Sequence, residues 1–476
     1  MNNKSQNFNS KTSALPHQIE AISYIYKNNI IALFDEQGLG KTKIVIEALC
    51  WEMKQGNIEG VLVIAPMSLL YNWEQEVCKH SFLIPIVLQG TEREKRYKFL
   101  TGANFYITNY EAVIAETQRI KRFCKSRSVA IVLDESARIK DPKSKTAQAI
   151  FQLAQYSKKR IIISGTPVAN KPYDLWAQYY FLDNGKLFGI DFKRFKAKYN
   201  YKNSDYEVNL TELKEIINAN SIRRLKNNVL ELPEKQYNNF LVKITGKQFE
   251  LYDQLRKELI IEITNIHGEI IIDESSSILK KLLRLTQIAS NPHLIDKSYD
   301  ETPAKFTKLD QILNTIISKN EKAIIWTCFV ENVITLKIRY KSYYPLVIYG
   351  DVPIKERFEY VQEFQNSEKN KIMILNPSAA REGITLTRAN NAIYLDRNFN
   401  LVDYLQSQDR IHRISQIKEC KIYKLIARQT VDEYIENLVD VKKDIAGFIQ
   451  GDNKLIKDET FDFLTNKSEL LSMLGG

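Results

Sequence analysis

The first candidate for chemistry is the stretch at residues 35–42, which reads Asp-Glu-Gln-Gly-Leu-Gly-Lys-Thr. It follows a β-rich apolar run at residues 30–34 and precedes residues 43–53, whose apolar positions suit a half-buried helix. A glycine-rich turn between a strand and a helix lets backbone N–H groups face phosphate oxygens. The stretch therefore predicts a nucleotide site.

Four residues of this turn have the types that such a site needs. Gly38 and Gly40 permit the tight turn, Lys41 supplies a positive charge, and Thr42 supplies a hydroxyl for Mg²⁺. Asp35 stands where the general phosphate-binding pattern has its first glycine. An ordinary strand-to-helix turn that contains Gly-Lys-Thr therefore stays the alternative.

Two acids follow the buried-strand pattern at residues 129–133. In a doubly wound sheet, ligands bind beyond the carboxyl ends of the strands, so Asp134 and Glu135 should lie beside the glycine turn. We expect Asp134 to hold Mg²⁺, usually through water, and Glu135 to orient the attacking water or accept its proton. The alternative is that the pair caps the next helix.

Small hydroxyls and one amide complete the candidates in the first half of the chain. Ser164 and Thr166 follow a strand-like run at residues 160–164 and could pass the nucleotide state to neighbouring loops, or form a plain turn. Gln18 lies upstream of the first strand. Its amide can donate and accept together, which suits the edge of adenine.

Two arginines lie near the end of the chain, in the stretch at residues 406–413. Arg410 and Arg413 are three apart, which predicts one helical face, and a planar guanidinium suits the charge on a transferring phosphate. A solvated helix face is the alternative. The loop at residues 383–387 could contact phosphate and nucleic acid, or serve only as a turn.

The elements that must position these residues form two blocks, in which short β-rich runs alternate with helical patterns. This alternation predicts an α/β fold with two doubly wound parallel sheets. In the first block the runs lie at residues 30–34, 61–65, 105–108, 129–133 and 160–164. In the second block they lie at residues 323–327, 345–349, 371–375, 392–396 and 421–425.

Between the blocks, from about residue 171 to residue 308, strand-like runs mostly vanish and helical sequence takes over, for example at residues 248–263 and 277–289. We therefore expect five regions. These are a flexible tail (1–13), a first lobe (14–170), a helical insertion (171–308), a second lobe (309–445) and a C-terminal tail or brace (446–476).

Composition narrows the class of protein. Hydrophobic residues make up 44% and charged residues 26% of the 476 residues, as in soluble globular proteins, and no stretch approaches the roughly 18 apolar residues of a membrane span. The net charge of +11 is compatible with a polyanionic partner. The five cysteines are scattered, which argues against a zinc ribbon or disulfide framework and fits a reducing cytosol.

Together these motifs resemble the superfamily two helicases and, within them, the Swi/Snf family of double-stranded DNA translocases, over about residues 15–439. Residues 35–42 look like the family's Asp-Glu-Met-Gly-Leu-Gly-Lys-Thr, in which the aspartate is expected. Residues 134–140 resemble its Asp-Glu-Ala-His-Arg-Ile-Lys box, with Ala137 in place of the histidine, and this change leaves the coupling strength open.

Two features in the middle of the chain distinguish the Swi/Snf resemblance from that of a generic helicase, namely the elements at 223–226 and 232–235 and the signature at 285–294. Residues 223–226 and 232–235 resemble the family's Arg-Arg-x-Lys and Leu-Pro-x-Lys elements. Residues 285–294 are similar to its Leu-Arg-Gln-x-x-x-His-Pro-x-Leu signature, with Asn291 for the histidine. Residues 408–416 are similar to its arginine motif, with Ser415 for a glycine.

The resemblance implies two RecA-like lobes that use ATP and Mg²⁺. It implies nucleotide binding by Gln18, Gly38, Gly40, Lys41, Thr42 and Gly383. It implies a coupling role for Ser164, Thr166 and Gln406. DNA contacts are expected at Asn109, Tyr110, Arg138, Lys140, Trp326 and Thr385, with a place in the core as the alternative for Trp326.

The resulting prediction is a DNA-stimulated ATPase that moves on double-stranded DNA without extended strand separation, as a monomeric motor with DNA-bound proteins as further partners and no membrane. A bacterial or phage origin is expected. One alternative is a strand-separating DNA or RNA helicase. Another is a DNA-binding scaffold whose ATPase has degenerated. The presence of Lys41, Thr42, Asp134, Glu135, Arg410 and Arg413 argues against this alternative.

Overall fold

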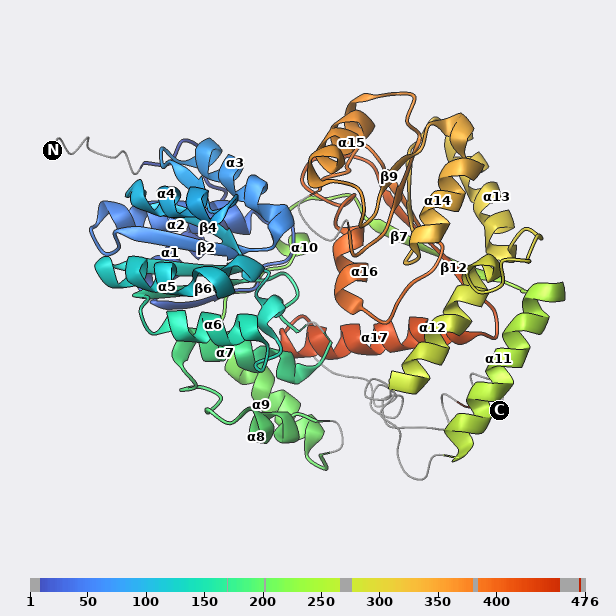
Figure 1. Ribbon diagram of the computed structural model, residues 1–476, viewed down its shortest axis with the longest axis horizontal. Helices are drawn as coiled ribbons and strands as arrows, with labels where there is room; N and C mark the ends of the chain where they lie inside the picture. Colours follow the sequence, from blue (N-terminus) through green and yellow to red (C-terminus); the bar gives the residue numbers. More distant parts are fainter. Residues whose placement is uncertain are drawn as a thin grey trace. The chain divides into compact units, whose positions relative to one another are not determined.

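The computed structural model describes residues 9–168, 170–200, 203–265, 276–379, 384–453 and 471. Contacts between Cα atoms divide the chain into two units. The first contains Met1–Glu231 with Ala446–Lys454, and the second contains Leu232–Ile445 with Leu455–Gly476. Each unit is built on its own parallel sheet with helices on both sides (Figure 1).

The first sheet has six described strands in the order β1-β6-β5-β2-β4-β3, all parallel. Their bounds are Ile30–Leu33 (β1), Gly60–Ala65 (β2), Pro85–Val87 (β3), Phe105–Asn109 (β4), Val129–Asp134 (β5) and Lys159–Ile163 (β6). Strands covered on both faces need apolar residues at successive positions, which is why these runs are nearly continuous.

The helices of the first unit cover both faces of this sheet. α1 to α3 contribute Ile25, Leu49 and Trp73 to the core on one face, while α5 and α7 contact strands from the other. The bounds are Pro16–Lys27 (α1), Lys41–Lys54 (α2), Leu70–His80 (α3), Glu92–Leu100 (α4), Tyr110–Ser126 (α5), Lys145–Ala154 (α6), Leu175–Asp183 (α7), Phe192–Lys198 (α8), Tyr206–Ala219 (α9) and Lys226–Val229 (α10).

The second sheet has the order β7-β12-β11-β8-β10-β9 among the described strands, again all parallel. Their bounds are Lys235–Val242 (β7), Ala323–Trp326 (β8), Leu346–Ile348 (β9), Ile372–Leu375 (β10), Asn391–Tyr394 (β11) and Cys420–Ala427 (β12). The helices are Gly246–Asn265 (α11), Ser276–Ser290 (α12), Ala304–Ser318 (α13), Val330–Arg339 (α14), Ile354–Asn366 (α15), Leu401–Gln408 (α16) and Val431–Ile449 (α17).

The doubly wound α/β fold and all ten expected strands are confirmed, and the structure adds two strands that the sequence did not reveal. β7 lies within the insertion that was expected to be helical, and it pairs with β12 over eight residues. As an edge strand it is largely exposed and carries polar residues, so it lacks the apolar run of a buried strand. β3 is a three-residue edge strand that begins with a proline.

The ends of the expected regions also differ from the structure. The insertion at 171–308 is divided between the two units, because α7 packs on β1 and β6 while β7 pairs with β12. Residues 446–449 belong to α17 rather than to a tail. Of the expected flexible tail, residues 1–8 lie outside the described residues, whereas the backbone N–H of Lys11 donates to the carbonyl of His80 at 2.9 Å.

None of the described helices combines the length and the apolar character that crossing a bilayer requires.

A buried ion pair ties β6 to α2 in the first unit. The ammonium group of Lys159 contacts the carboxylate of Glu52, and it also donates to the carbonyl of Ile25 at 2.7 Å. Only 2% of the Lys159 side chain and 4% of the Glu52 side chain are exposed. Each charge therefore depends on the other, because water does not reach them.

Replacing Lys159 with Met should lower the free energy of unfolding of the first unit by about 3–5 kcal/mol, because Glu52 is then buried without its cation. The adjacent Lys158 is exposed, so Lys158→Met is the matched control and should change little. Urea unfolding followed by tryptophan fluorescence measures both. Equal transition midpoints for the two variants would contradict the role given to the pair.

Candidate nucleotide site

The candidate site lies where three strands of the first sheet end. β6 lies between β1 and β5, and the register aligns Leu33 with Ile163 and Asp134 with Ile163. The segments that follow these strands therefore begin at the same edge of the sheet. This is the edge at which doubly wound sheets bind ligands.

The turn after β1 adopts the backbone that its glycines allow. Gly38 and Gly40 have φ angles of 93° and 81°, and α2 begins at Lys41. The positive φ of Gly40 strains any other residue at this position, and a Cβ atom there would lie 2.5 Å from Nε2 of Gln18, so that side chain would have to shift. Nε2 of Gln18 donates to the carbonyl of Leu39 at 3.2 Å. Gln18 therefore supports the turn, and its contact with adenine stays a prediction.

The side chain of Lys41 folds back over the turn. Its ammonium group donates to the carbonyls of Asp35 at 2.8 Å and Glu36 at 3.2 Å. Burial lowers the pKa of Lys41, and the nearby carboxylates of Glu135, Asp35 and Asp134 act in the opposite direction. The expected neighbourhood of Lys41 and the two acids is thus present in the structure.

Asp134 is held in a fixed orientation by two donors. Nε1 of Trp73 donates to Oδ2 at 2.7 Å, and the backbone N–H of Glu135 donates to Oδ1 at 2.9 Å. The hydroxyl of Tyr110 donates to the carbonyl of Asp134 at 2.7 Å. Sequence reasoning assigned no site role to Trp73, because its partner lies 61 positions away in the chain.

Glu135 has a backbone that is uncommon for a residue other than glycine. Its φ angle is 51°, in the left-handed region. Nε2 of Gln37, from the glycine turn, donates to Oε1 of Glu135 at 3.4 Å. The second acid therefore faces the turn that follows β1. It does not cap the next short helix, which spans Ser136–Ile139, with its side chain.

Asp35, the residue that departs from the general phosphate-binding pattern, is paired inside the first unit. Its fully buried carboxylate accepts from Nε of Arg224 at 3.0 Å, and a second contact joins Nη2 of Arg224 to Oδ2. The backbone N–H of Lys226 donates to Oε2 of Glu36 at 2.7 Å. The two acids of the turn are thus held by the Arg-Arg-x-Lys element, for which sequence reasoning offered no role.

The same element extends the edge of the first sheet. The N–H of Phe34 donates to the carbonyl of Ile222 at 2.9 Å, and the N–H of Glu36 donates to the carbonyl of Arg224 at 3.0 Å. Arg223 contacts the carbonyl of Phe34 at 2.6 Å and makes two bonds, of 2.6 and 2.5 Å, to the carboxylate of Asp452. Segments far apart in the chain therefore fix the start of the turn.

The expected coupling residues of the first unit lie in the loop after β6. The backbone N–H of Thr166 donates to Oγ of Ser164 at 3.1 Å. Gln178 of α7 joins this loop to the acidic motif, since it accepts from Oγ of Ser136 at 2.7 Å and donates to the carbonyl of Pro167 at 2.8 Å. The hydroxyl of Thr166 is buried and makes no hydrogen bond within the described residues. The coupling role itself stays a prediction.

The two arginines of the second unit do not lie on a helix, so the expected shared helical face is wrong. α16 ends at Gln408, and the residues that follow form turns because Asp409 closes the helix as its C-cap. Both side chains still reach one loop. Nη1 of Arg410 donates to the carbonyl of Ile384 at 3.4 Å, and Nη1 of Arg413 donates to Oγ1 of Thr385.

The surroundings of Arg413 disfavour its charged form. Burial lowers the pKa of Arg413, the charge of Arg410 lowers it further, and Asp409 opposes both. Gln406, the expected coupling residue of this unit, is buried in α16. Gly383, expected to bind nucleotide, lies outside the described residues.

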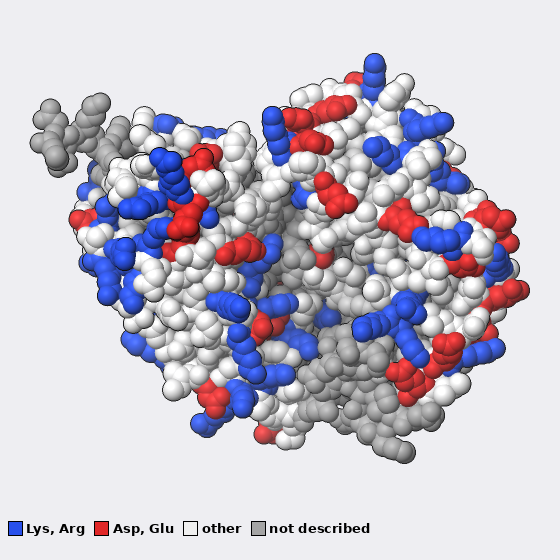
Figure 2. All heavy atoms as spheres, in the orientation of Figure 1, with Lys and Arg blue, Asp and Glu red and all other residues white. Residues whose placement is uncertain are grey.

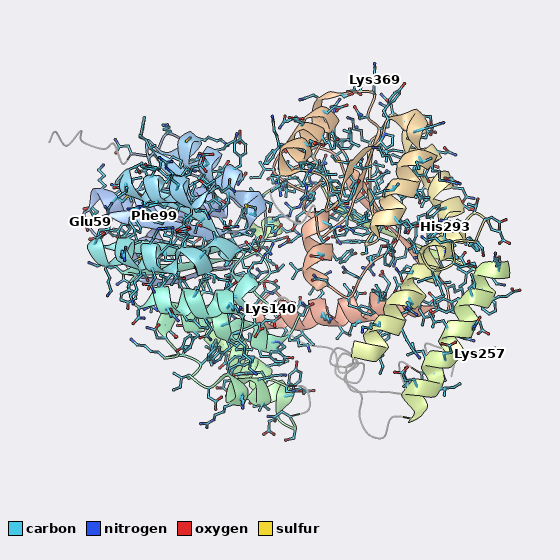
Figure 3. The ribbon with its side chains drawn as sticks, viewed as in Figure 1. Glu59, Phe99, Lys140, Lys257, His293 and Lys369 are labelled. Atoms are coloured by element: carbon cyan, nitrogen blue, oxygen red, sulfur yellow. The ribbon has the colours of Figure 1, made fainter. Side chains whose placement is uncertain are left out.

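The expected DNA contacts fall into two groups. Arg138 and Lys140 are exposed, as nucleic-acid contacts must be, and Lys140 is labelled in Figure 3. Asn109 and Tyr110 are buried, Asn109 accepts from the N–H of Ala112 as the cap of α5, and Tyr110 is bonded to Asp134. Both side chains therefore offer little surface to DNA in this structure, and their contact with DNA stays a prediction.

Trp326 lies inside the second unit. Its side chain is fully buried in β8, and its ring stacks on Tyr394 with the ring centres 6.4 Å apart. The expected DNA contact is wrong for this residue. Trp326 instead occupies a core position, which was the alternative. Thr385, the sixth expected contact, is half-buried and bonded to Arg413.

The chain has two parallel-sheet units, and the first carries a glycine turn, a lysine and an acidic pair at one sheet edge. These features are typical of helicase-like nucleotide-binding proteins. Comparison with known families gives the narrower assignment. The SNF2-related domain matches residues 17–294, and the helicase conserved C-terminal domain matches residues 304–415. The chain belongs to the SNF2-related family.

Curated relatives and one solved structure extend the comparison. The ISWI chromatin-remodeling complex ATPase ISW2 of Saccharomyces cerevisiae is 27% identical over 96% of this chain and 42% of its own length. The putative ATP-dependent helicase/translocase YwqA of Bacillus subtilis is 29% identical over 88% of this chain and 46% of its own length. The chain thus spans less than half of each of these two relatives.

The solved structure described as the Sulfolobus solfataricus SWI2/SNF2 ATPase core in complex with dsDNA is 29% identical. The similarity covers 97% of this chain and 98% of that one, with a TM-score of 0.45.

Replacing Arg224 with Ala should weaken nucleotide binding by roughly tenfold or more, because the buried Asp35 carboxylate loses its cation and the turn shifts. Titration with a fluorescent ATP analogue measures this dissociation constant. Arg194→Ala, at an exposed position of α8, is the control. Combining Arg224→Ala with Asp35→Asn should recover part of the loss. Unchanged affinity in the single variant would contradict the pairing role.

Proposed function

We propose that this chain is an ATP-driven translocase on double-stranded DNA that remodels or displaces DNA-bound proteins without extended strand separation. The observation that carries the proposal is the grouping of Lys41 with Glu135 and Asp134 at one sheet edge, in a chain of the SNF2-related family. Relatives named as a chromatin-remodeling ATPase and a helicase/translocase support the choice of DNA as the track.

ATP and Mg²⁺ are the proposed cofactors, and the residues present suit them. Backbone N–H groups of the turn and the N-terminus of α2 would face the phosphate oxygens, and Lys41, which donates to the carbonyl of Asp35 in this structure, would neutralise their charge. Mg²⁺ prefers oxygen ligands and keeps several waters, so Thr42 and the Asp134 carboxylate, held by two donors, form a fitting donor set. The ion supplies neutralisation of the phosphate charge.

Glu135 is the proposed group that orients the attacking water and accepts its proton. Its contact with Gln37 directs the carboxylate toward the turn that binds phosphate. Gln178 links the acidic motif to the loop of Ser164 and Thr166, so a shift at the acids can reach that loop through two hydrogen bonds.

Arg410 and Arg413 are the proposed source of positive charge for hydrolysis. Desolvation lowers the pKa of the half-buried Arg413, and the charge of the buried Arg410 beside it lowers this pKa further. An anion beside them relieves this repulsion, so the pair is suited to a phosphate group that gains charge in the transition state. Gln406 is proposed to couple this pair to the neighbouring loop, and Thr385, which accepts from Arg413, stays a proposed DNA contact.

DNA binding is proposed to rest on backbone phosphates. Arg138 and Lys140 are exposed, and the chain carries a net charge of +11. Contacts of this kind give affinity that falls with salt and depends little on sequence. A monomeric motor with DNA and DNA-bound proteins as its partners follows from this proposal.

The decisive experiment compares two substrates in the presence of ATP. A translocase on duplex DNA should displace the third strand of a triplex while leaving a plain duplex with a single-stranded tail unseparated. Separation of the plain duplex would replace the proposal with a strand-separating helicase, and stimulation of hydrolysis by RNA alone would replace it with an RNA helicase. Absence of phosphate release with every nucleic acid would leave a DNA-binding scaffold.

Replacing Lys41 with Ala should abolish DNA-stimulated phosphate release and leave DNA affinity within about twofold of the wild type, because the charge is lost from the phosphate site alone. Lys54→Ala, at an exposed position of the same helix, is the control. Phosphate release and DNA binding by fluorescence anisotropy measure the two effects. Equal rates in wild type and Lys41→Ala would refute the assignment.

Replacing Arg413 with Ala should lower the rate of hydrolysis by roughly 10³-fold while nucleotide affinity changes little, because the arginine acts on charge that develops in the transition state. The exposed Arg388 of the same unit is paired with Glu368, and Arg388→Ala serves as the control. Single-turnover hydrolysis and nucleotide titration separate the effects. A normal rate in Arg413→Ala would exclude the role.

A further inference from the structure

A hollow in the surface of the first unit lies apart from the residues discussed above. It is a hollow of 810 Å³ between α6, α7 and the beginning of α8. Four aromatic side chains line it, namely Phe151, Trp176, Tyr180 and Phe192. The volume falls within the range of about 300–1,000 Å³ that is usual for ligand sites, and the four rings share the lining with polar side chains, among them Gln148, Gln152 and Gln155.

Trp176 lines this hollow and carries a buried hydrogen-bond donor. The residue is 5% exposed, and Nε1 is buried without a hydrogen-bond partner within the described residues. Its ring stacks on Tyr180 with centres 4.7 Å apart and lies 5.5 Å from the ring of Phe192. Buried indole N–H groups normally find an acceptor, so a ligand oxygen in the hollow would supply what the protein does not.

The rim of the hollow is positively charged. Lys143 and Lys193 line it, and the lining acid, Asp191, accepts from the N–H groups of Lys193 and Arg194 as the cap of α8. In Figure 2, blue Lys and Arg side chains gather over the part of the first unit that holds α6 to α9 in Figure 1. The charge of the rim therefore complements an acidic ligand.

One large apolar side chain extends the hollow outward. Ile190, which lines it, is 77% exposed. Next to Phe192, the ring of Tyr173 lies 6.4 Å away and carries the ammonium group of Lys196 above it at 5.4 Å. Exposed apolar side chains that border an aromatic pocket and basic groups are typical of a surface that another protein covers.

We propose that this hollow is a docking site for an acidic peptide segment of a partner protein, anchored by an aromatic or large aliphatic side chain. The anchor fills the space between the rings, a backbone carbonyl accepts from Nε1 of Trp176, and neighbouring carboxylates face Lys143 and Lys193. Such a site tethers the motor to a partner and does not require ATP. It is independent of the proposed function.

Nucleic acid would also be attracted by the lysines, but the aromatic rings favour a peptide. Single-stranded nucleic acid binds by stacking bases on free ring faces. Here one face of Trp176 is covered by Tyr180 at an interplanar angle of 18°, and Phe151 meets the edge of Tyr180 at 66°. The rings thus form walls around a space for a side chain rather than a platform for bases.

The test begins with a random peptide library displayed on phage and selected on the full chain without nucleotide or DNA. The proposal predicts enriched sequences in which an aromatic or large aliphatic residue stands beside Asp or Glu. The most enriched sequence is then synthesised with a fluorescent label, and its dissociation constant is measured by anisotropy. Enrichment of basic or uncharged sequences would overturn the proposal.

Variants then locate the bound peptide. Ile190→Asp places a carboxylate in the hollow and should weaken binding by roughly tenfold, the size of one interface anchor. Ile84→Asp is the matched control, because Ile84 of the same unit is also 77% exposed, and it should bind as the wild type. Trp176→Phe keeps a ring and removes the N–H, and should weaken binding several-fold with an unchanged unfolding temperature.

Two results would overturn the docking site. The first is equal affinity of the peptide for the wild type and for Ile190→Asp. The second is displacement of the peptide by a single-stranded DNA oligonucleotide whose own affinity falls in Ile190→Asp, which would make the hollow a nucleic-acid surface. Neither result depends on hydrolysis, so failure here is separate from failure of the translocase proposal.

Discussion

The structure of the first unit depends on the balance of charge around Lys41. The half-buried ammonium group needs acceptors, and it finds two backbone carbonyls and a set of neighbouring carboxylates. One of these, Asp35, is itself buried and requires Arg224. Arg223 beside it joins the end of β1 to Asp452. A chain of paired charges thus runs from the phosphate turn to residues near the end of the sequence.

Two residues that depart from the family's motifs form hydrogen bonds within the second unit. Asn291, in place of a histidine, donates to the side-chain carbonyl of Asn332 at 2.9 Å and caps the short helix Pro292–Leu294. Ser415, in place of a glycine, shares a hydrogen bond of 2.8 Å with Thr387, two residues after the loop position that Arg413 contacts. In both cases a polar side chain that is new to the motif is satisfied within the second unit.

The strands and the nucleotide turn could be predicted from the sequence because each depends on residues that are close together in the chain. Strands buried on both faces must be apolar at successive positions, so all ten were found, whereas the polar edge strand β7 was not. The glycine turn, Lys41 and the acid pair were found because phosphate chemistry restricts both residue type and spacing. The Asp35 departure found its explanation only in the tertiary pairing with Arg224.

The sequence by itself determined the α/β class, the strands of two sheets and the residue types of the nucleotide site, since each depends on neighbours a few positions away. Only the tertiary structure decided that Trp73 orients Asp134, that Tyr110 and Trp326 are buried, and that Arg410 and Arg413 leave the helix. These facts depend on partners that are distant in the chain. Burial and hydrogen bonding are properties of the folded surroundings, and no local spacing records them.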